Sequence, residues 1–171
     1  MYAYKYYDGV SSGYDELHGE EQRQKLLIIN KELNFSKHHK ILDVGGGTGI
    51  SVEILNSKVV ILEPSSKMID QGLLKRRFDY VNDFAENIAE IFEENEFDAI
   101  ISLTSAHHFH DLNKVMLGIK KALKDESDLV ITMLKKSDKL DLIKKEFEKN
   151  FLLKKEMVEE KDVILFFKNK K

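Results

Sequence analysis

The stretch that decides the fold is Lys-Ile-Leu-Asp-Val-Gly-Gly-Gly-Thr-Gly at positions 40–49. Its apolar residues predict a short buried strand, and we expect a polar helix to begin near Ile50, so the glycines fall at a strand-to-helix turn. Folds of the α/β class bind ligands at such turns. Glycine allows the backbone to bend sharply and approach a ligand, and the helix N-terminus would offer unpaired N–H groups. The stretch therefore predicts a loop that holds a nucleotide-type cofactor.

The spacing of the glycines discriminates between cofactors. A dinucleotide fingerprint has a third glycine three residues after the second, but Ile50 stands three residues after Gly47. A phosphate-binding P-loop ends in Gly-Lys-Ser/Thr, whereas Gly49 is followed by Ile50 and Ser51. An NAD site is therefore disfavoured and a P-loop is excluded. The pattern that remains is an acid followed by three glycines at alternate positions, Asp43, Gly45, Gly47 and Gly49.

This pattern resembles motif I of the class I S-adenosylmethionine-dependent methyltransferases, and three further segments follow in that family's order. The second strand ends in Glu63 and Pro64, twenty residues after Asp43, where an acid would accept both hydroxyls of a ribose. Without the resemblance, Glu63 could simply precede a helix that a serine caps. The third strand ends before Asp83, whose counterpart in the family contacts the adenine. The resemblance implies S-adenosylmethionine as cofactor, held by Asp43, Gly45, Gly47, Gly49, Glu63, Pro64, Asp83, Phe84 and Thr104.

The fourth strand runs into Thr-Ser-Ala-His-His-Phe-His-Asp at 104–111, an ending familiar from small-molecule methyltransferases. Within the family, the resemblance is to the group that includes the ubiquinone and menaquinone biosynthesis enzymes. His107 and His108 are the candidate catalytic residues, because imidazole titrates near neutrality and can remove a proton from an acceptor. The alternative is that they only shape the pocket or cap the next helix. Histidines adjacent in sequence rarely point at one ion, so we expect no metal.

The chain before the first strand divides into a tyrosine-rich opening and a helix over 20–33. Tyr7 and Tyr14 flank a glycine- and serine-rich segment, 9–13, that should be mobile. We predict a lid that closes over the cofactor and substrate, with a disordered terminus as the alternative. The expected organisation is a single methyltransferase domain, with residues 1–36 forming the lid and helix and residues 37–171 forming the cofactor-binding core.

Strand and helix patterns alternate through the core, which predicts a parallel α/β sheet. The resemblance implies a three-layer Rossmann-like methyltransferase fold with seven strands in the order 3-2-1-4-5-7-6 and an antiparallel C-terminal hairpin. We expect strands at 40–44, 58–62, 78–81, 97–103, 128–134, 151–158 and 163–167. Helices are expected at 112–123 and around 140–147, the second capped by Ser137. The loop before the fifth strand, 124–128, lacks the proline and glycines common in the family, so its turn is uncertain.

The amino-acid composition excludes several classes of function. The 171 residues are 42% hydrophobic and contain no cysteine, which excludes disulfides, thiolate nucleophiles and cysteine metal sites. No apolar run approaches the roughly 20 residues needed to span a bilayer, and no secretory leader is visible. We therefore expect a cytoplasmic enzyme with no membrane partner.

Charge and motif together favour a small-molecule methyl acceptor. Base-methylating enzymes usually carry Asn or Asp, Pro-Pro and an aromatic residue after the fourth strand, and residues 104–107 have no such motif. The last 37 residues carry 12 lysines against 8 acids, which keeps a tRNA or protein substrate open as an alternative. A third possibility is a non-catalytic S-adenosylmethionine-binding module that needs a partner.

Overall fold

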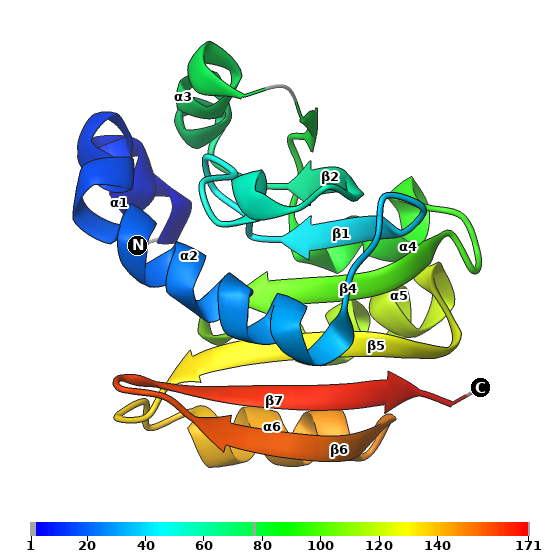
Figure 1. Cartoon of the computed structure of the whole chain (residues 1–171). Coiled ribbons are helices and arrows are strands. Elements are labelled where there is room, and N and C mark those ends of the chain that lie inside the picture. The colour runs from blue at the N-terminus through cyan, green and yellow to red at the C-terminus, as the bar shows by residue number, and fades with distance from the viewer. Residues whose placement is uncertain (1–2, 77, 171) are drawn as a thin grey trace.

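The structure is a computed structural model that describes residues 3–76 and 78–170 (Figure 1). It is built around one seven-stranded sheet in the order β3-β2-β1-β4-β5-β7-β6. Strands β1 to β5 are parallel, and β7 is antiparallel to both β5 and β6. The predicted topology is confirmed. The strands are β1 (Lys40–Val44), β2 (Lys58–Leu62), β3 (Asp79–Val81), β4 (Phe97–Leu103), β5 (Leu123–Leu134), β6 (Phe151–Val158) and β7 (Asp162–Asn169).

Helices cover both faces of the sheet, but unequally. One face packs against α4, α5 and α6, whose Ile88, Val115 and Phe147 are buried with the inward side chains of the strands. The other face packs mainly against α2, through Leu26 and Ile29. Figure 1 shows α2 crossing one face while α4, α5 and α6 lie behind the sheet. The helices are α1 (Ala3–Val10), α2 (Tyr14–Leu33), α3 (Ser66–Lys75), α4 (Ile88–Ile91), α5 (Leu112–Ala122) and α6 (Leu140–Glu148).

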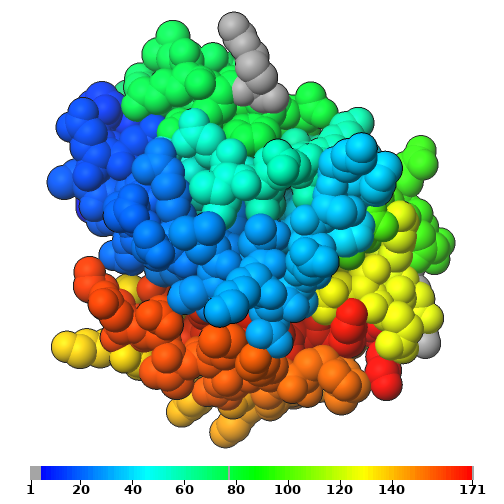
Figure 2. All heavy atoms as spheres, in the orientation of Figure 1, coloured from blue at the N-terminus to red at the C-terminus, as the bar shows by residue number. Residues whose placement is uncertain are grey.

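The N-terminal segment is more regular than its sequence suggests. Helix α2 begins at Tyr14 rather than near residue 20, and a separate helix α1 precedes it. Between them, Ser11–Gly13 forms a short 3₁₀ turn in which Ser11 is buried. Helix α1 lies beyond the carboxyl ends of the parallel strands, beside α3 (Figure 1). The space-filling view shows the N-terminal residues packed continuously against the body of the protein (Figure 2).

Three local predictions are wrong. The glycine loop leads into turns and a single 3₁₀ turn, Val52–Ile54, instead of a helix, because only eight residues, 50–57, separate the loop from β2. Helix α6 begins after Lys139 and has no side-chain cap; Ser137 Oγ lies 3.3 Å from the Lys139 N–H instead. Strand β5 starts at Leu123, five residues early, and the irregular stretch is accommodated by Glu126 at φ 55° and a register shift against β4.

Candidate active site

The glycine loop follows β1 and has the conformation that its sequence requires. Gly45, Gly47 and Gly49 have φ values of 73°, 59° and 77°, in the left-handed region that favours glycine. A Cβ atom on Gly45 would lie 2.6 Å from Ser105 Cβ, and one on Gly47 would lie 2.9 Å from Met68 Cε. Both positions border a cavity that a larger residue would fill. Gly49 lies against Ile61 instead, where a Cβ would approach Ile61 Cδ1 to 2.6 Å.

Glu63 reaches this loop because strands β1 and β2 end in register. Val44 pairs with Leu62, so the first residues after each strand are neighbours. The Glu63 carboxylate accepts hydrogen bonds from the Gly47 N–H at 3.0 Å and from the Ser65 N–H at 2.8 Å. Burial raises the pKa of Glu63 to about 7, against the lowering effect of these two bonds. Because each carboxylate oxygen has two lone-pair sites, the group can still accept hydrogen bonds from a ligand.

Asp43 lies beneath the loop rather than in the cavity. Its side chain is 1% exposed, and neither carboxylate oxygen has a hydrogen-bond partner among the described residues. Burial, with a smaller contribution from the charge of Glu63, raises its pKa to about 7. A Cβ on Gly46 would lie 2.5 Å from Asp43 Oδ2, so the carboxylate supports the loop from below. The loop therefore stands on an acid whose charge nothing in the structure balances.

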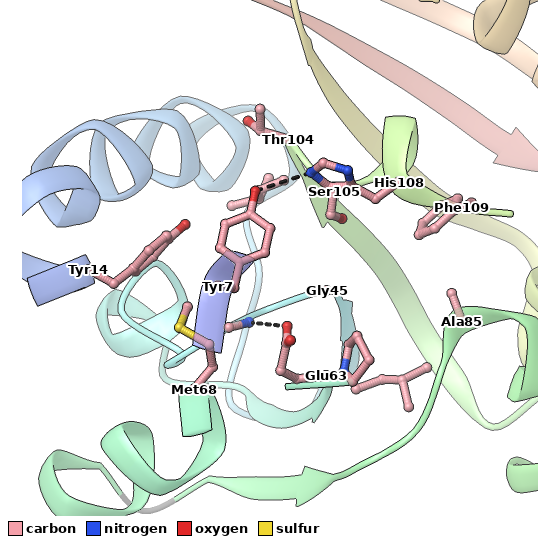
Figure 3. Close-up of a pocket in the computed structure, with 14 residues that line it drawn as sticks. Tyr7, Tyr14, Gly45, Glu63, Met68, Ala85, Thr104, Ser105, His108 and Phe109 are labelled. Carbon is pink, nitrogen blue, oxygen red and sulfur yellow. Dashed lines mark hydrogen bonds between the residues drawn. The ribbon is translucent and has the colours of Figure 1, made fainter. Parts of the chain in front are cut away.

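A cavity of about 80 Å³ opens at the carboxyl ends of β1, β2 and β4. Figure 3 shows Tyr7 crossing it, with Glu63 on one side and His108 on the other. Eight of the predicted site residues line this cavity: Tyr7, Tyr14, Gly45, Gly47, Glu63, Pro64, Thr104 and His108. Six lining residues were not predicted, namely Leu62, Met68, Ala85, Leu103, Ser105 and Phe109. Five of these six, all but Met68, adjoin a predicted residue in sequence, which is the signal that could have found them.

Five predicted residues do not line the cavity: Asp43, Gly49, Asp83, Phe84 and His107. Asp83 Oδ1 accepts hydrogen bonds from the Phe84 N–H and from Asn87 Nδ2, both at 2.7 Å. Its carboxylate therefore orders the turn after β3. The neighbouring Ala85 reaches the cavity instead.

The two candidate catalytic histidines have different surroundings. His108 faces the cavity, and its Nε2 lies 3.2 Å from the Tyr7 hydroxyl (Figure 3). Burial lowers the pKa of His108 to about 4, with help from the charges of His107 and Lys139. The His107 ring packs against that of His108 with centroids 3.8 Å apart and planes tilted by 46°, and burial also lowers the pKa of His107. Both imidazoles are therefore neutral near pH 7, and only His108 can meet a ligand in the cavity.

The lid residues hold α1 over the site by polar contacts. Besides the Tyr7 contact to His108, Asp8 Oδ1 accepts a hydrogen bond of 2.6 Å from Ser65 Oγ. Ser65 in turn caps α3 by accepting from the Met68 N–H. Tyr2, in the tyrosine-rich opening, lies outside the described residues. In the described ranges no three His, Asp or Glu side chains are grouped so as to hold a metal ion. None of the helices described there is long and apolar enough to cross a bilayer.

Comparison with known proteins identifies the family. Residues 42–131 match the family described as Methyltransferase domain. The chain belongs to this family. An uncharacterised protein of Methanocaldococcus jannaschii is 29% identical over 149 residues, which cover 86% of this chain and 57% of that protein. The chain thus spans little more than half the length of that curated relative.

Solved structures share the fold of this methyltransferase domain. A complex of the Trm112 methyltransferase activator of Haloferax volcanii with its proposed methyltransferase matches with a TM-score of 0.81 at 9% identity, covering 100% of this chain and 99% of that one. A proposed S-adenosylmethionine-dependent methyltransferase from Methanococcus maripaludis matches with a TM-score of 0.76 at 16% identity, covering 100% of this chain and 95% of that one. Membership of the methyltransferase family, with this fold, implies S-adenosylmethionine as the cofactor.

The residues present fit that cofactor. Gly45 and Gly47 border the cavity without side chains of their own, and Glu63 keeps lone pairs for hydroxyl donors beside them. Asp43 does not line the cavity, so it could favour a positively charged ligand only through its charge and not by contact.

Proposed function

We propose that this methyltransferase domain transfers a methyl group to a small-molecule acceptor. The observation that carries the proposal is the small, partly covered site: the cavity at the strand ends is lined largely by apolar and aromatic side chains, and the protein's own Tyr7 and Tyr14 form part of its wall. Such a site suits an acceptor that can be enclosed whole. A loop or base of a macromolecule would need an open route through the position that α1 occupies.

The cover must move during the catalytic cycle. The cavity of about 80 Å³ is small beside the roughly 300–1,000 Å³ of typical ligand sites. Tyr7 and Tyr14 reach into it from the N-terminal segment, so their displacement is the simplest way to admit the cofactor. Closure would then exclude water from the reacting groups. This gives the predicted lid role to Tyr7 of α1 and to Tyr14, the first residue of α2.

When bound, the cofactor supplies an electrophilic methyl group on a sulfonium. The chain's own residues would hold and orient the reactants. Glu63 provides polar contacts beside the glycine loop, and His108 faces the acceptor side with a neutral imidazole. Because the low pKa of His108 makes it a weak base, we expect it to accept a hydrogen bond from the acceptor and orient it, with His107 buttressing its ring. Acceptor atoms that already carry a free lone pair are favoured.

The lysine-rich tail gives little support to a tRNA substrate. Five of its lysines form ion pairs: Lys144 with Glu156, Lys149 with Glu146, Lys155 with Glu32, Lys161 with Glu21 and Lys168 with Asp128. Paired lysines contribute little to phosphate binding, which depends on net positive charge.

The proposal is tested by incubating the protein with methyl-labelled S-adenosylmethionine and separate small-molecule, RNA and protein fractions of a cell extract. Label should enter the small-molecule fraction and should fall at least ten-fold with Glu63→Ala. Label confined to the RNA or protein fraction would contradict the proposal. Glu53→Ala, at a partly exposed acid outside the cavity, is the matched control.

A second candidate is a methyltransferase that depends on a partner subunit. It is favoured by the whole-chain similarity to the methyltransferase that is bound to the Trm112 activator in Haloferax volcanii. Trm112 from an archaeal source, added to the labelling assay, is the probe. Transfer that occurs only in its presence would support this candidate, and equal transfer with and without it would count against it.

A further inference from the structure

Thr104, at the carboxyl end of β4, has an unusual backbone conformation. Its φ is 54°, in the left-handed region that a β-branched residue rarely adopts. It also lines the cavity, between Leu103 and Ser105. Strained residues persist only where surrounding contacts hold them, and they gather at functional sites. The question is therefore what holds Thr104 in place.

Two elements hold it. From the neighbouring strand β5, Thr132 accepts hydrogen bonds from the Thr104 N–H through its Oγ1, at 2.9 Å, and through its carbonyl oxygen, at 3.1 Å. From helix α2, 79 residues earlier in the chain, Lys25 Nζ donates to Thr104 Oγ1 at 2.9 Å. The Thr104 hydroxyl is thus held both by a residue of the N-terminal helix and by Thr132 Oγ1, which lies 3.2 Å from it.

Lys25 is a buried cation with no donor left for a ligand. Its side chain is 3% exposed. Its ammonium lies 2.7 Å from Asp162 Oδ2 at the start of β7 and 3.0 Å from Glu21 Oε1. An ammonium has three donors, and Glu21, Asp162 and Thr104 account for all three. Any effect of Lys25 on the site must therefore pass through Thr104.

Stability alone is a weak reason to bury this ion pair. Desolvation of the two charges offsets most of their attraction, and an apolar pair of similar volume is often as stable. Lys25 and Asp162 would anchor α2 to β7 no better than two well-packed aliphatic residues. The contact to Thr104 is what aliphatic residues could not provide.

We propose that Lys25 is a positioning residue of the methyltransferase site: through Thr104 Oγ1 it holds the strained end of β4 in the conformation that forms the wall of the cofactor cavity. This inference rests on the proposed function, because it takes the cavity to be where S-adenosylmethionine binds. It makes the docking of α2 a condition for an intact site.

The test separates two roles of Lys25: positioning Thr104 in the cavity wall, and anchoring α2 to β7 through Asp162. Lys25→Met alone leaves Asp162 unpaired and should lower both the melting temperature and the affinity for S-adenosylmethionine. The double variant Lys25→Met/Asp162→Leu removes both charges. We expect it to recover most of the melting temperature but to bind S-adenosylmethionine at least five-fold more weakly than the wild type by calorimetric titration. A double variant that binds within two-fold of the wild type would overturn the inference.

A second pair of variants keeps the inference testable if the double variant does not fold. Thr104→Val removes the hydroxyl and leaves the Lys25–Asp162 pair in place, and Thr104→Ser is its control. Thr104→Val should bind S-adenosylmethionine at least five-fold more weakly than the wild type, whereas Thr104→Ser should bind within two-fold; Thr104→Val that also binds within two-fold would overturn the inference. Where Lys25→Met folds, the loss caused by Thr104→Val should be largely absent in that background, because the two residues act through one contact, and equal losses in both backgrounds would refute the coupling. Failure of the wild type itself to bind S-adenosylmethionine would instead overturn the proposed function, and this inference with it.

Discussion

Helices α1 and α2 adjoin in the chain, yet they are attached to the protein in different ways. Leu26 and Ile29 of α2 are fully buried in the core against the sheet. None of the side chains described in α1, those of residues 5–10, is fully buried. Helix α1 is held at Tyr7 and Asp8 by hydrogen bonds to the rim of the cavity. Apolar burial makes α2 part of the fold, whereas α1 is attached by a few polar contacts, as the proposed role of a cover requires.

The largest effect should come from α2. Leu26→Ala should lower the free energy of unfolding by about 2–5 kcal/mol, because it removes a fully buried aliphatic side chain and leaves a cavity. Urea unfolding without cofactor measures it. Leu17→Ala on the same helix is the matched control, since Leu17 is 71% exposed, and should change stability by less than about 0.5 kcal/mol. Similar losses at both positions would show that α2 does not owe its attachment to this buried stripe.

The two helices also differ in how predictable they were. Short apolar runs in the sequence predict the buried strands. The resemblance to class I methyltransferases adds the order of these strands in the sheet. Helix α2 was predicted in part, because Leu26 and Ile29 lie at helical spacing. Helix α1 has only eight residues, three of them tyrosines, which is too short a stretch for helical periodicity to be recognised. Similarly, the distance between Lys25 and Thr104 in the chain, 79 residues, hides a contact that only the packed fold creates.

Within the site, the structure brings predicted residues together where their place is set by their own strand end. Gly45, Gly47 and Glu63 meet because β1 and β2 end in register. Asp83 lies apart from them, because its carboxylate turns to Asn87 and to the next N–H. That choice depends on the local turn geometry, which the sequence pattern does not specify.

A second prediction compares the charges that the two helices contribute. The charges of α2 near the core are paired, as with Lys25, but α1 brings the Asp8 carboxylate close enough to raise the pKa of Glu63. Carboxyls in the unfolded chain ionise near pH 4, whereas burial raises the pKa of Asp43 and Glu63 to about 7. Between about pH 4 and 7 the folded protein therefore keeps protons that the unfolded chain has lost. The contribution of these groups to the free energy of unfolding falls as pH rises through that window.

Asp43→Asn should remove much of this dependence of the free energy of unfolding on pH. A pKa difference of one corresponds to about 1.4 kcal/mol, so we expect the variant to gain stability relative to the wild type by a few kcal/mol at pH 8 and by much less at pH 5. Urea unfolding at both pH values measures this difference. Asp70→Asn, at an exposed acid of α3, is the control and should leave the slope unchanged. If the free energy of unfolding of Asp43→Asn differed from that of the wild type by the same amount at pH 5 and pH 8, burial would not have raised the pKa of Asp43.

The smallest effect should come from α1 itself. Tyr7→Phe removes the hydroxyl that lies 3.2 Å from His108 Nε2, while the ring keeps its edge contacts with Tyr6 and Tyr14. A single hydrogen bond of this kind is worth about 0.5–1.5 kcal/mol. If that bond is part of what holds the cover closed, amide hydrogen exchange in residues 3–13 should accelerate by a few-fold to about ten-fold without cofactor. Exchange in residues 14–33 should stay unchanged, because their protection depends on the burial of Leu26 and Ile29. Acceleration of both segments together would mean that the two helices open as one unit, and the cover would then include the helix that carries Lys25.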